Sequence, residues 1–260
     1  MKKWISIIEG ILSIAILILI WNIASSTGIF GHVTVKSSQL LLPPPSKVLK
    51  SIYEMIVSGD LISNLLVSLV RVLKGFAIAV CIGIPVGIFM GLNKHFYNFI
   101  NPIFRIISPI PGVAWVPLAI LWFGLGDVAA IFIITVGSIS PIITNTLQGV
   151  QDVDPILNQA LQTMGASKIQ IITKCILPSI IPNIVSAFRL GIGFAWRVVI
   201  AAELVGVPNG VGYILNVGRS TGHTEVTIVT ILCLGAMMIL MDRVLFVPIE
   251  NMTKKWKAVD

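Results

Sequence analysis

The sequence predicts an all-α integral membrane protein with about six transmembrane helices. Hydrophobic residues make up 56% of the 260 residues, charged residues make up 11%, and the mean hydropathy is +0.97. A soluble domain usually carries about 25% charged residues. Several apolar runs reach the roughly 20 residues that a helix needs to cross a bilayer. We therefore expect lipid to surround most of the chain.

The first expected span is Ile5–Ala24, which follows Lys2 and Lys3. It resembles a signal peptide, but no small-residue cleavage site closes the apolar run, so we expect it to be retained. An extended connector follows, because the consecutive prolines within Leu41–Ser46 cannot continue a helix. The apolar spacing of Lys47–Ser58 then predicts a short interfacial helix, which Gly59 ends.

The second expected span is Leu65–Leu92, and it contains a stripe of glycines four residues apart. Gly83, Gly87 and Gly91 lie on one helical face, where a second helix can approach closely. The stripe therefore predicts helix packing. Pro85 is expected to kink the same span.

The third expected span, Pro102–Phe123, is rich in proline. Pro109, Pro111 and Pro117 predict an irregular backbone. Such backbone is tolerated at membrane depth only where protein or a water-filled cavity covers it. The prolines are consistent both with a solute pathway and with simple kinked packing.

The remaining spans are expected at Val128–Leu147, Ile180–Val205 and Val226–Val247, with turns at Gly124–Asp127 and Gly206–Tyr213. We expect three regions: residues 1–62 as an N-terminal transmembrane helix with its connector, 63–250 as the main membrane domain, and 251–260 as a tail.

The basic residues predict that both termini lie in the cytoplasm. Lysines at both ends, and basic residues between the second and third spans, agree with the positive-inside rule. Three lysines of the first outer loop conflict with the rule: Lys36, Lys47 and Lys50.

Between the fourth and fifth spans lies a segment with a polar face, Asp152–Pro178, which we call the island. Asp154 and Pro155 are typical of a helix start. Gly165 is placed to end that helix in a left-handed conformation. Ser167 with Gln170 resembles a capping box that opens a second helix. The pattern predicts a helix, a glycine hinge and a second helix, either as a docking site for a partner or as a simple connector.

The island resembles the EAA motif of ATP-binding-cassette (ABC) importer permeases. Gln159, Ala160 and Leu161 occupy the Glu-Ala-Ala positions, Gly165 the glycine, and Leu177 and Pro178 the Leu-Pro. Ser68–Phe76, Ser108–Asp127, Arg189–Leu204 and Met241–Phe246 resemble the branch that imports nitrate, sulfonates, taurine and bicarbonate. The chain departs from the motif at Gln159, Leu161 and Cys175, so an ion pair from the motif Glu to the ATPase is not expected.

The resemblance implies a type I ABC importer permease fold with a cytoplasmic coupling helix between spans four and five. It implies two ATP-binding subunits, a second permease copy as a homodimer, and an extracytoplasmic solute-binding protein as partners. The ATPase activity is expected in a separate subunit, because the chain has no phosphate-binding loop. The coupling residues it implies are Asp154, Pro155, Gln159, Ala160, Leu161, Gly165, Ala166, Ser167, Leu177 and Pro178.

Ionisable residues inside the membrane are costly and are therefore candidates for function. Arg197 and Glu203 of the fifth span, with Trp196 and Trp115, are the pathway candidates. Arg197 suits an anion if it faces the pathway, and is structural if it pairs with Glu203 or with a neighbouring helix. The two residues are about 120° apart on an ideal helix, so a direct pair needs long side chains.

Other function classes have less support in the sequence. The net charge of +7 comes from residues at the ends of apolar runs, which does not suggest nucleic-acid binding. The three separate cysteines predict no metal site, and no cofactor is expected. A secondary transporter would need no docking island, and an intramembrane enzyme would need a catalytic motif. A neutral pyrimidine or vitamin precursor remains an alternative solute.

Overall fold

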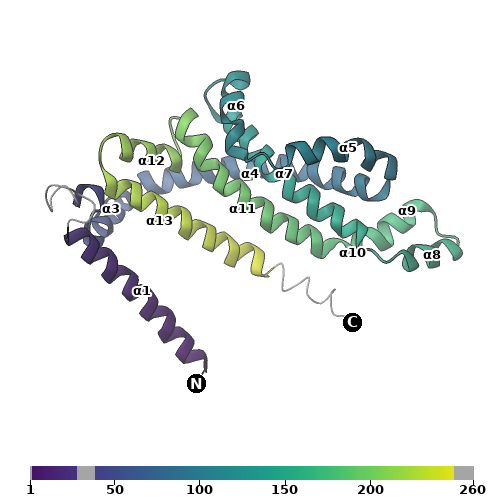
Figure 1. Cartoon of the computed structure of the whole chain (residues 1–260), viewed down its shortest axis with the longest axis horizontal. Helices are drawn as coiled ribbons and strands as arrows, with labels where there is room; N and C mark the ends of the chain where they lie inside the picture. Colours follow the sequence, from purple (N-terminus) through teal and green to yellow (C-terminus); the bar gives the residue numbers. More distant parts are fainter. Residues whose placement is uncertain (1, 28–38, 249–260) are drawn as a thin grey trace. The chain divides into compact units, whose positions relative to one another are not determined.

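The computed structural model describes residues 2–27 and 39–248, and every regular element within these ranges is a helix. Five helices are long and apolar enough to cross a membrane, and one bent pair adds a sixth span if it is counted as one. This agrees with the expected all-α membrane fold of about six spans (Figure 1). The tail 251–260, its lysines and Lys36 lie outside the described residues.

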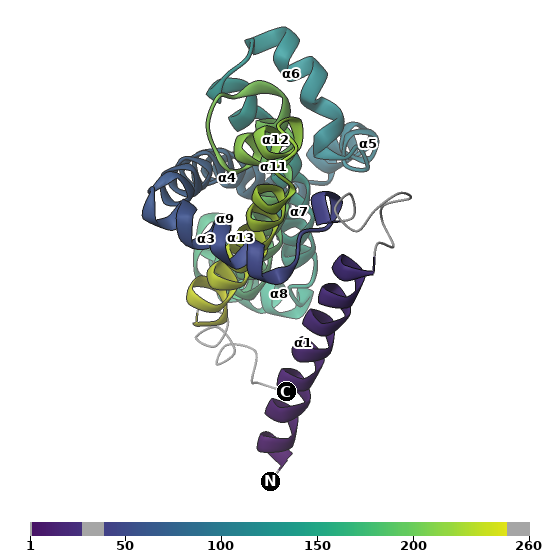
Figure 2. The same cartoon turned by 90° about the vertical axis from the view of Figure 1, so that its left-hand side faces the viewer.

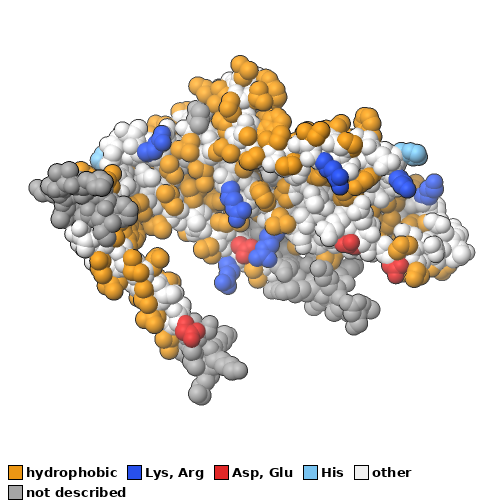
Figure 3. Space-filling view, in the orientation of Figure 1, with side chains coloured by type: hydrophobic (Ala, Val, Ile, Leu, Met, Phe, Trp, Pro, Cys, Tyr) orange, Lys and Arg blue, Asp and Glu red, His pale blue; other side chains and the backbone are white. Residues whose placement is uncertain are grey.

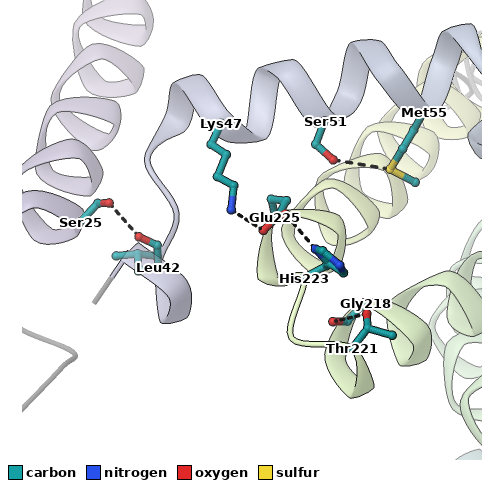
Figure 4. Close-up of polar contacts among 9 residues, drawn as sticks. All are labelled: Ser25, Leu42, Lys47, Ser51, Met55, Gly218, Thr221, His223 and Glu225. Carbon is teal, nitrogen blue, oxygen red and sulfur yellow. Dashed lines mark hydrogen bonds and ion pairs between the residues drawn. The ribbon is translucent and has the colours of Figure 1, made fainter. Parts of the chain in front are cut away.

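The helices form two units. The first contains residues 1–66 and 209–235, and the second contains residues 67–208 and 236–260. The first unit holds α1 (Lys2–Ser26), α3 (Pro45–Val57), α12 (Val211–Ser220) and the first part of α13 (Thr224–Met241). Side chains of α1 hold the proline-rich connector. Trp21 Nε1 donates to the Pro43 carbonyl at 3.0 Å. Ser25 Oγ donates to the Leu42 carbonyl at 2.7 Å (Figure 4).

Two lysines that conflict with the positive-inside rule have acidic partners in the first unit. Lys47 Nζ lies 3.2 Å from Glu225 Oε2, and His223 Nδ1 lies 3.2 Å from the other oxygen of the same carboxylate (Figure 4). Lys50 lies 3.6 Å from Glu54. Each of these two lysines therefore has a nearby carboxylate that offsets its charge locally.

The second unit is built around three long helices, α4 (Asp60–Leu92), α7 (Asp127–Gln151) and α11 (Ile181–Gly206). Helices α7 and α11 run side by side (Figure 1). Gly137 of α7 faces Val198 of α11, and Gly149 of α7 faces Asn183 of α11, so closely that an added Cβ would lie 2.9 Å and 2.7 Å from them. Small residues therefore let the two backbones approach, as in other membrane helix pairs.

The predicted glycine stripe of α4 packs against α7. A Cβ added at Gly83 would lie 2.8 Å from Ile142 Cγ2, one at Gly87 would lie 2.8 Å from Thr146 Cβ, and one at Gly91 would lie 2.5 Å from Val150 Cγ1. The sequence did not single out Gly75, which extends the same contact to Ile134. Helix α4 also continues unbroken through Pro85.

The third span is the largest correction to the predicted boundaries. Helix α5 spans Lys94–Ile107 instead of beginning at Pro102, and it passes through that proline. Asn93 fixes its start by accepting from the His95 and Phe96 N–H groups. The chain breaks at 108–111, which contains Pro109 and Pro111. A short 3₁₀ turn, η1 (Gly112–Trp115), and helix α6 (Val116–Phe123) follow, bent by 87° from α5 (Figures 1 and 2).

The segment Gly206–Tyr213 was expected to be a turn, but the turn ends at Gly210 and Tyr213 belongs to helix α12. Gly210 has a φ of +108°, and its N–H donates to Asn64 Oδ1 at 2.7 Å. A tertiary contact fixes this boundary, so local sequence could not place it. Helix α4 likewise starts at Asp60 rather than Leu65, directly after Gly59 at a φ of +79°.

The glycine stripe yields a stability prediction. In Gly87→Ala the new methyl meets Thr146 Cβ and, at 3.0 Å, the Ile143 carbonyl oxygen, neither of which can rotate away. We expect a loss of about 1–3 kcal/mol from overpacking. The matched control is Gly235→Ala in α13, where no described atom beyond the adjoining helix backbone lies within 4 Å of the added carbon. It should be neutral or slightly stabilising, because alanine favours a helix by about 0.5–1 kcal/mol.

Thermal unfolding of both purified variants in detergent measures the difference. An unchanged melting temperature in Gly87→Ala would contradict the close contact between α4 and α7.

Candidate functional site

The island forms two short helices with the predicted caps. Asp154 caps α8 (Pro155–Thr163) by accepting from the Ile156 N–H at 2.8 Å, and Pro155 occupies the first helical turn. Ser167 caps α9 (Lys168–Ile171) through a reciprocal box, in which the Ser167 N–H donates to Gln170 Oε1 and the Gln170 N–H donates to Ser167 Oγ. Each cap satisfies N–H groups that a helix start leaves unpaired.

Gly165 joins the two helices in a left-handed conformation, with a φ of +80°. Its N–H donates to the Gln162 carbonyl, and the N–H of Ala166 donates to the Leu161 carbonyl. This closes α8 in the manner of a glycine C-cap. A residue with a Cβ would be strained at this position, so the backbone requires glycine.

The island is packed against the ends of the long helices. Val150 of α7, Val153, Ile171, Ile176 and Ile180 form a buried cluster, and Leu161, Ala166, Cys175 and Leu177 pack against it. After α9 the chain continues as η2 (Ile172–Ile176), a π-helical turn, and α10 (Leu177–Ser179), which contains Pro178. The short helices thus connect to α7 and α11 through side-chain contacts as well as through the chain.

The island also presents apolar side chains that nothing in the described chain covers. Ile156, Met164 and Ile169 are 68%, 81% and 73% exposed, and Leu157 is 49% exposed. No residue of α8 is buried. Gln159 and Ala160 are exposed beside them. A shallow groove runs between α8 and the start of α11, lined by Leu157, Ala160, Leu161, Lys174, Cys175, Pro178, Ser179 and Pro182. Figure 1 shows α8 and α9 beyond the ends of α7 and α11.

A buried ionic cluster that the sequence analysis missed joins the three long helices. Arg71 of α4 is 3% exposed and Glu203 of α11 is 1% exposed. Arg71 Nη1 donates to Glu203 Oε1 at 2.7 Å, and Ser68 Oγ lies 2.8 Å from both carboxylate oxygens. Arg71 also contacts the more exposed Asp127 of α7 at 2.7 Å. The position of Arg71 within an apolar span could have predicted this cluster, since an arginine inside a membrane needs a partner.

The pathway candidates lie in different surroundings. Glu203 is inside the ionic cluster, so the pair with Arg197 does not form. Arg197 is exposed, and its guanidinium lies 5.9 Å from the centre of the Phe194 ring. Trp196 is 2% exposed, within the packed interior. Trp115 lies in η1, and its buried indole N–H has no hydrogen-bond partner among the described residues.

Arg189 has a separate role at the other half of α11. It forms a two-pronged ion pair with Asp242, with N–O distances of 2.9 and 3.1 Å. Both side chains are partly exposed, and the pair ties α11 to η3 (Asp242–Phe246), which continues α13. Of the three cysteines, Cys81 is exposed, and Cys175 and Cys233 are partly buried.

Comparison of the sequence with models of known protein families gives a match. Residues 83–249, well over half of the chain, match the model of the binding-protein-dependent transport system inner membrane component. The chain belongs to this family. It is therefore a multi-pass permease of the ABC importer class, in agreement with the resemblance of its sequence motifs.

Individual similar proteins are also named as transporter permeases. A putative ABC transporter permease of Methanocaldococcus jannaschii is 37% identical over 72% of this chain and 70% of its own length. The taurine transport system permease TauC of Escherichia coli is 32% identical, covering 79% and 76%. The bicarbonate transport system permease CmpB of Synechococcus elongatus is 32% identical, covering 94% and 90%.

Solved structures support the fold. An inward-facing structure of the MetNI methionine ABC transporter aligns with 72% of this permease and 95% of the matched chain, with a TM-score of 0.58 and 22% identity. The fold is thus that of a type I ABC importer permease.

The ionic cluster yields a prediction of its own. Arg71→Met should destabilise the permease by about 3–5 kcal/mol, because it leaves the buried Glu203 carboxylate without its guanidinium partner. The double variant Arg71→Met with Glu203→Leu should recover most of this loss, since both charges are then gone. Asp127→Asn should change stability by at most about 1 kcal/mol, because Asp127 is 63% exposed.

Unfolding of the three proteins in detergent provides the comparison. If the double variant were less stable than Arg71→Met alone, the cluster would not be a mutually compensating pair.

Proposed function

We propose that the island is the segment through which a separate ATP-hydrolysing subunit drives this permease. The single observation that carries the proposal is its exposed apolar surface, Ile156, Leu157, Met164 and Ile169, which lies outside every candidate membrane span. Because these residues belong to no spanning segment, we assign their cover to a protein partner, and large exposed patches commonly mark protein interfaces. A soluble subunit with an apolar groove is the partner that fits.

The remaining coupling residues shape this surface or hold it in place. Asp154, Pro155 and Ser167 fix where α8 and α9 begin, and Gly165 fixes the angle between them. Gln159 is exposed and uncharged, so it contacts the partner without an ion pair. Leu161, Ala166 and Leu177 belong to the packed side, and Pro178 lines the groove between α8 and α11.

The packing supports a route for the motion. Leu161 of the island contacts the cluster that contains Val150 of α7 and Ile180 at the start of α11. When two ATPase subunits close on ATP, a displacement of α8 is therefore carried to the ends of α7 and α11. Because these helices pack tightly along glycine positions, they move as one body and change access to the pathway.

The assembly that follows has two permease copies, two ATPase subunits and an extracytoplasmic solute-binding protein, with the pathway between the copies. The permease domain is assigned to residues 63–250, the island to the cytoplasmic side, and both termini to the cytoplasm. The solutes of the relatives suggest the cargo, a small molecule such as a sulfonate, taurine or bicarbonate.

Gly165→Val provides the test of coupling. A β-branched residue at a φ of +80° costs about 1–2 kcal/mol locally and changes the turn between α8 and α9. The reconstituted transporter should still insert and bind its ATPase subunit, but ATP hydrolysis should no longer produce uptake. Uptake and ATP hydrolysis are measured in the same proteoliposomes.

Gly222→Val is the matched control, because Gly222 also has a positive φ, of +75°. Apart from its chain neighbours, no described atom lies within 4 Å of an added Cβ there. The substitution lies before α13, away from the island in sequence, and should leave the ratio of uptake to hydrolysis unchanged. Normal uptake by Gly165→Val, or equal uncoupling by both variants, would refute the coupling role.

A further inference from the structure

A cavity of about 520 Å³ opens where the third span is broken. Its walls come from the end of α5, the broken segment 108–112, the middle of α7 and Phe194 of α11. All of these elements belong to the second unit. Volumes of this size suit small-molecule sites, which combine apolar walls with a few polar groups.

One wall of the cavity carries hydroxyl and amide groups. Ser108 of the broken segment and Ser140 of α7 have their Oγ atoms 2.5 Å apart. Only one proton can lie between two hydroxyls, so the accepting hydroxyl keeps its own proton free to donate to a third group. Thr144 and Asn145 follow along α7, and Asn145 uses one amide proton for the Pro141 carbonyl. The cavity therefore offers several hydrogen-bond donors.

The charge beside the cavity is positive. None of its lining residues, all within the described chain, is acidic. Arg197 of α11 lies next to the cavity, because Phe194 lines the cavity and also contacts the Arg197 guanidinium. The neighbouring Val198 packs against Gly112 and Gly137, which are lining residues as well. Arg197 is exposed and has no ion-pair partner among the described side chains.

An exposed arginine inside a membrane span is costly unless an anion or water meets it. Arg197 is seven residues from the end of the apolar segment Ile181–Leu204, which places its Cα roughly 10 Å inside the span. Every other arginine of the second unit's long helices, Arg71 and Arg189, has a carboxylate partner in the described structure. Arg197 does not itself line the cavity, but its guanidinium lies 5.9 Å from the centre of the Phe194 ring, which does.

We propose that this cavity is a binding site for a small oxyanion during transport, with Arg197 holding the negative charge and Ser108, Ser140, Thr144 and Asn145 donating to the oxygens. The proposal rests on the proposed function, because it assigns the cavity to the solute pathway. The proposed site favours anions such as sulfonate, bicarbonate or nitrate over neutral solutes. Planar guanidinium groups bind oxyanions through paired hydrogen bonds, which explains why an arginine serves here.

The test is equilibrium binding to the permease in phosphatidylcholine nanodiscs, without its solute-binding protein. The probes are ethanesulfonate, nitrate and bicarbonate, and ethyl methyl sulfone serves as an uncharged match for ethanesulfonate. We expect at least one anion to bind and the sulfone to bind much more weakly. If no anion binds, or if the sulfone binds as well as ethanesulfonate, the proposal is overturned.

Variants test the residues. Arg197→Gln should weaken anion binding about tenfold to a hundredfold, the range expected for losing a charged hydrogen bond. Arg197→Lys should retain more of it, and Ser140→Ala should weaken binding several-fold. The controls are Arg219→Gln, which removes an exposed arginine of α12, and Ser186→Ala, which removes an exposed hydroxyl of α11. Equal affinity in Arg197→Gln and Arg219→Gln would overturn the assignment.

Two further measurements distinguish a solute site from a lipid-headgroup site, and the anion site from the coupling role. If added anionic lipid abolishes binding of the small anion to the wild type but leaves Arg197→Gln unaffected, Arg197 is a lipid-headgroup site and the pathway assignment is wrong.

ATP hydrolysis and binding of the ATPase subunit are measured on the same preparations. A permease that assembles and couples but binds no anion refutes this inference alone, whereas one that binds anions but never engages an ATPase subunit refutes the proposed function alone.

Discussion

The close packing of α7 between α4 and α11 is the constraint on which the other features depend. In a bilayer no hydrophobic effect drives one helix onto another, so tight contact between backbones must supply the association. Glycines provide it on both sides of α7: Gly83, Gly87 and Gly91 belong to α4, and Gly137 and Gly149 belong to α7 itself. Apolar side chains can then remain on the outer surface, as they do over α1 and α6 (Figure 3).

The same three helices place functional groups at separate points along their length. The Arg71–Glu203 pair joins α4 to α11 and reaches Asp127 at the first turn of α7. The broken span and its cavity lie against the middle of α7, and the island follows its last residue. The tight packing of α4, α7 and α11 connects these points, so in the proposed mechanism a displacement at the island is transmitted along these helices. This is how a permease can use work done outside the membrane.

Local features of the site could be predicted from the sequence, because neighbouring residues determine them. The caps at Asp154 and Ser167 and the left-handed Gly165 depend on hydrogen bonds within three or four residues, and the structure has all of them. The glycine stripe of α4 could be predicted for a similar reason, since its spacing alone defines a face. Its partner helix could not be named, because the spacing does not specify what packs against that face.

Features that depend on distant contacts were missed or misplaced. Nothing near Arg71 in the sequence points to Glu203, which lies 132 residues away. The start of α12 depends on the contact between Gly210 and Asn64. The third span was expected to begin at Pro102, yet α5 passes through this residue and the chain breaks only at Pro109 and Pro111. The resemblance to importer permeases supplied the coupling assignment, which the pattern of the island alone left open.

The most direct test of the central claim, that a partner subunit covers the apolar face of the island, is cysteine accessibility. In a permease whose three native cysteines are replaced by serine, Met164→Cys and Leu157→Cys should react readily with a water-soluble maleimide when the permease is alone. Both should become protected when the ATPase subunit is added, whereas Tyr53→Cys, at an exposed position of α3, should not change. Equal labelling of Met164→Cys with and without bound ATPase subunit would contradict the account.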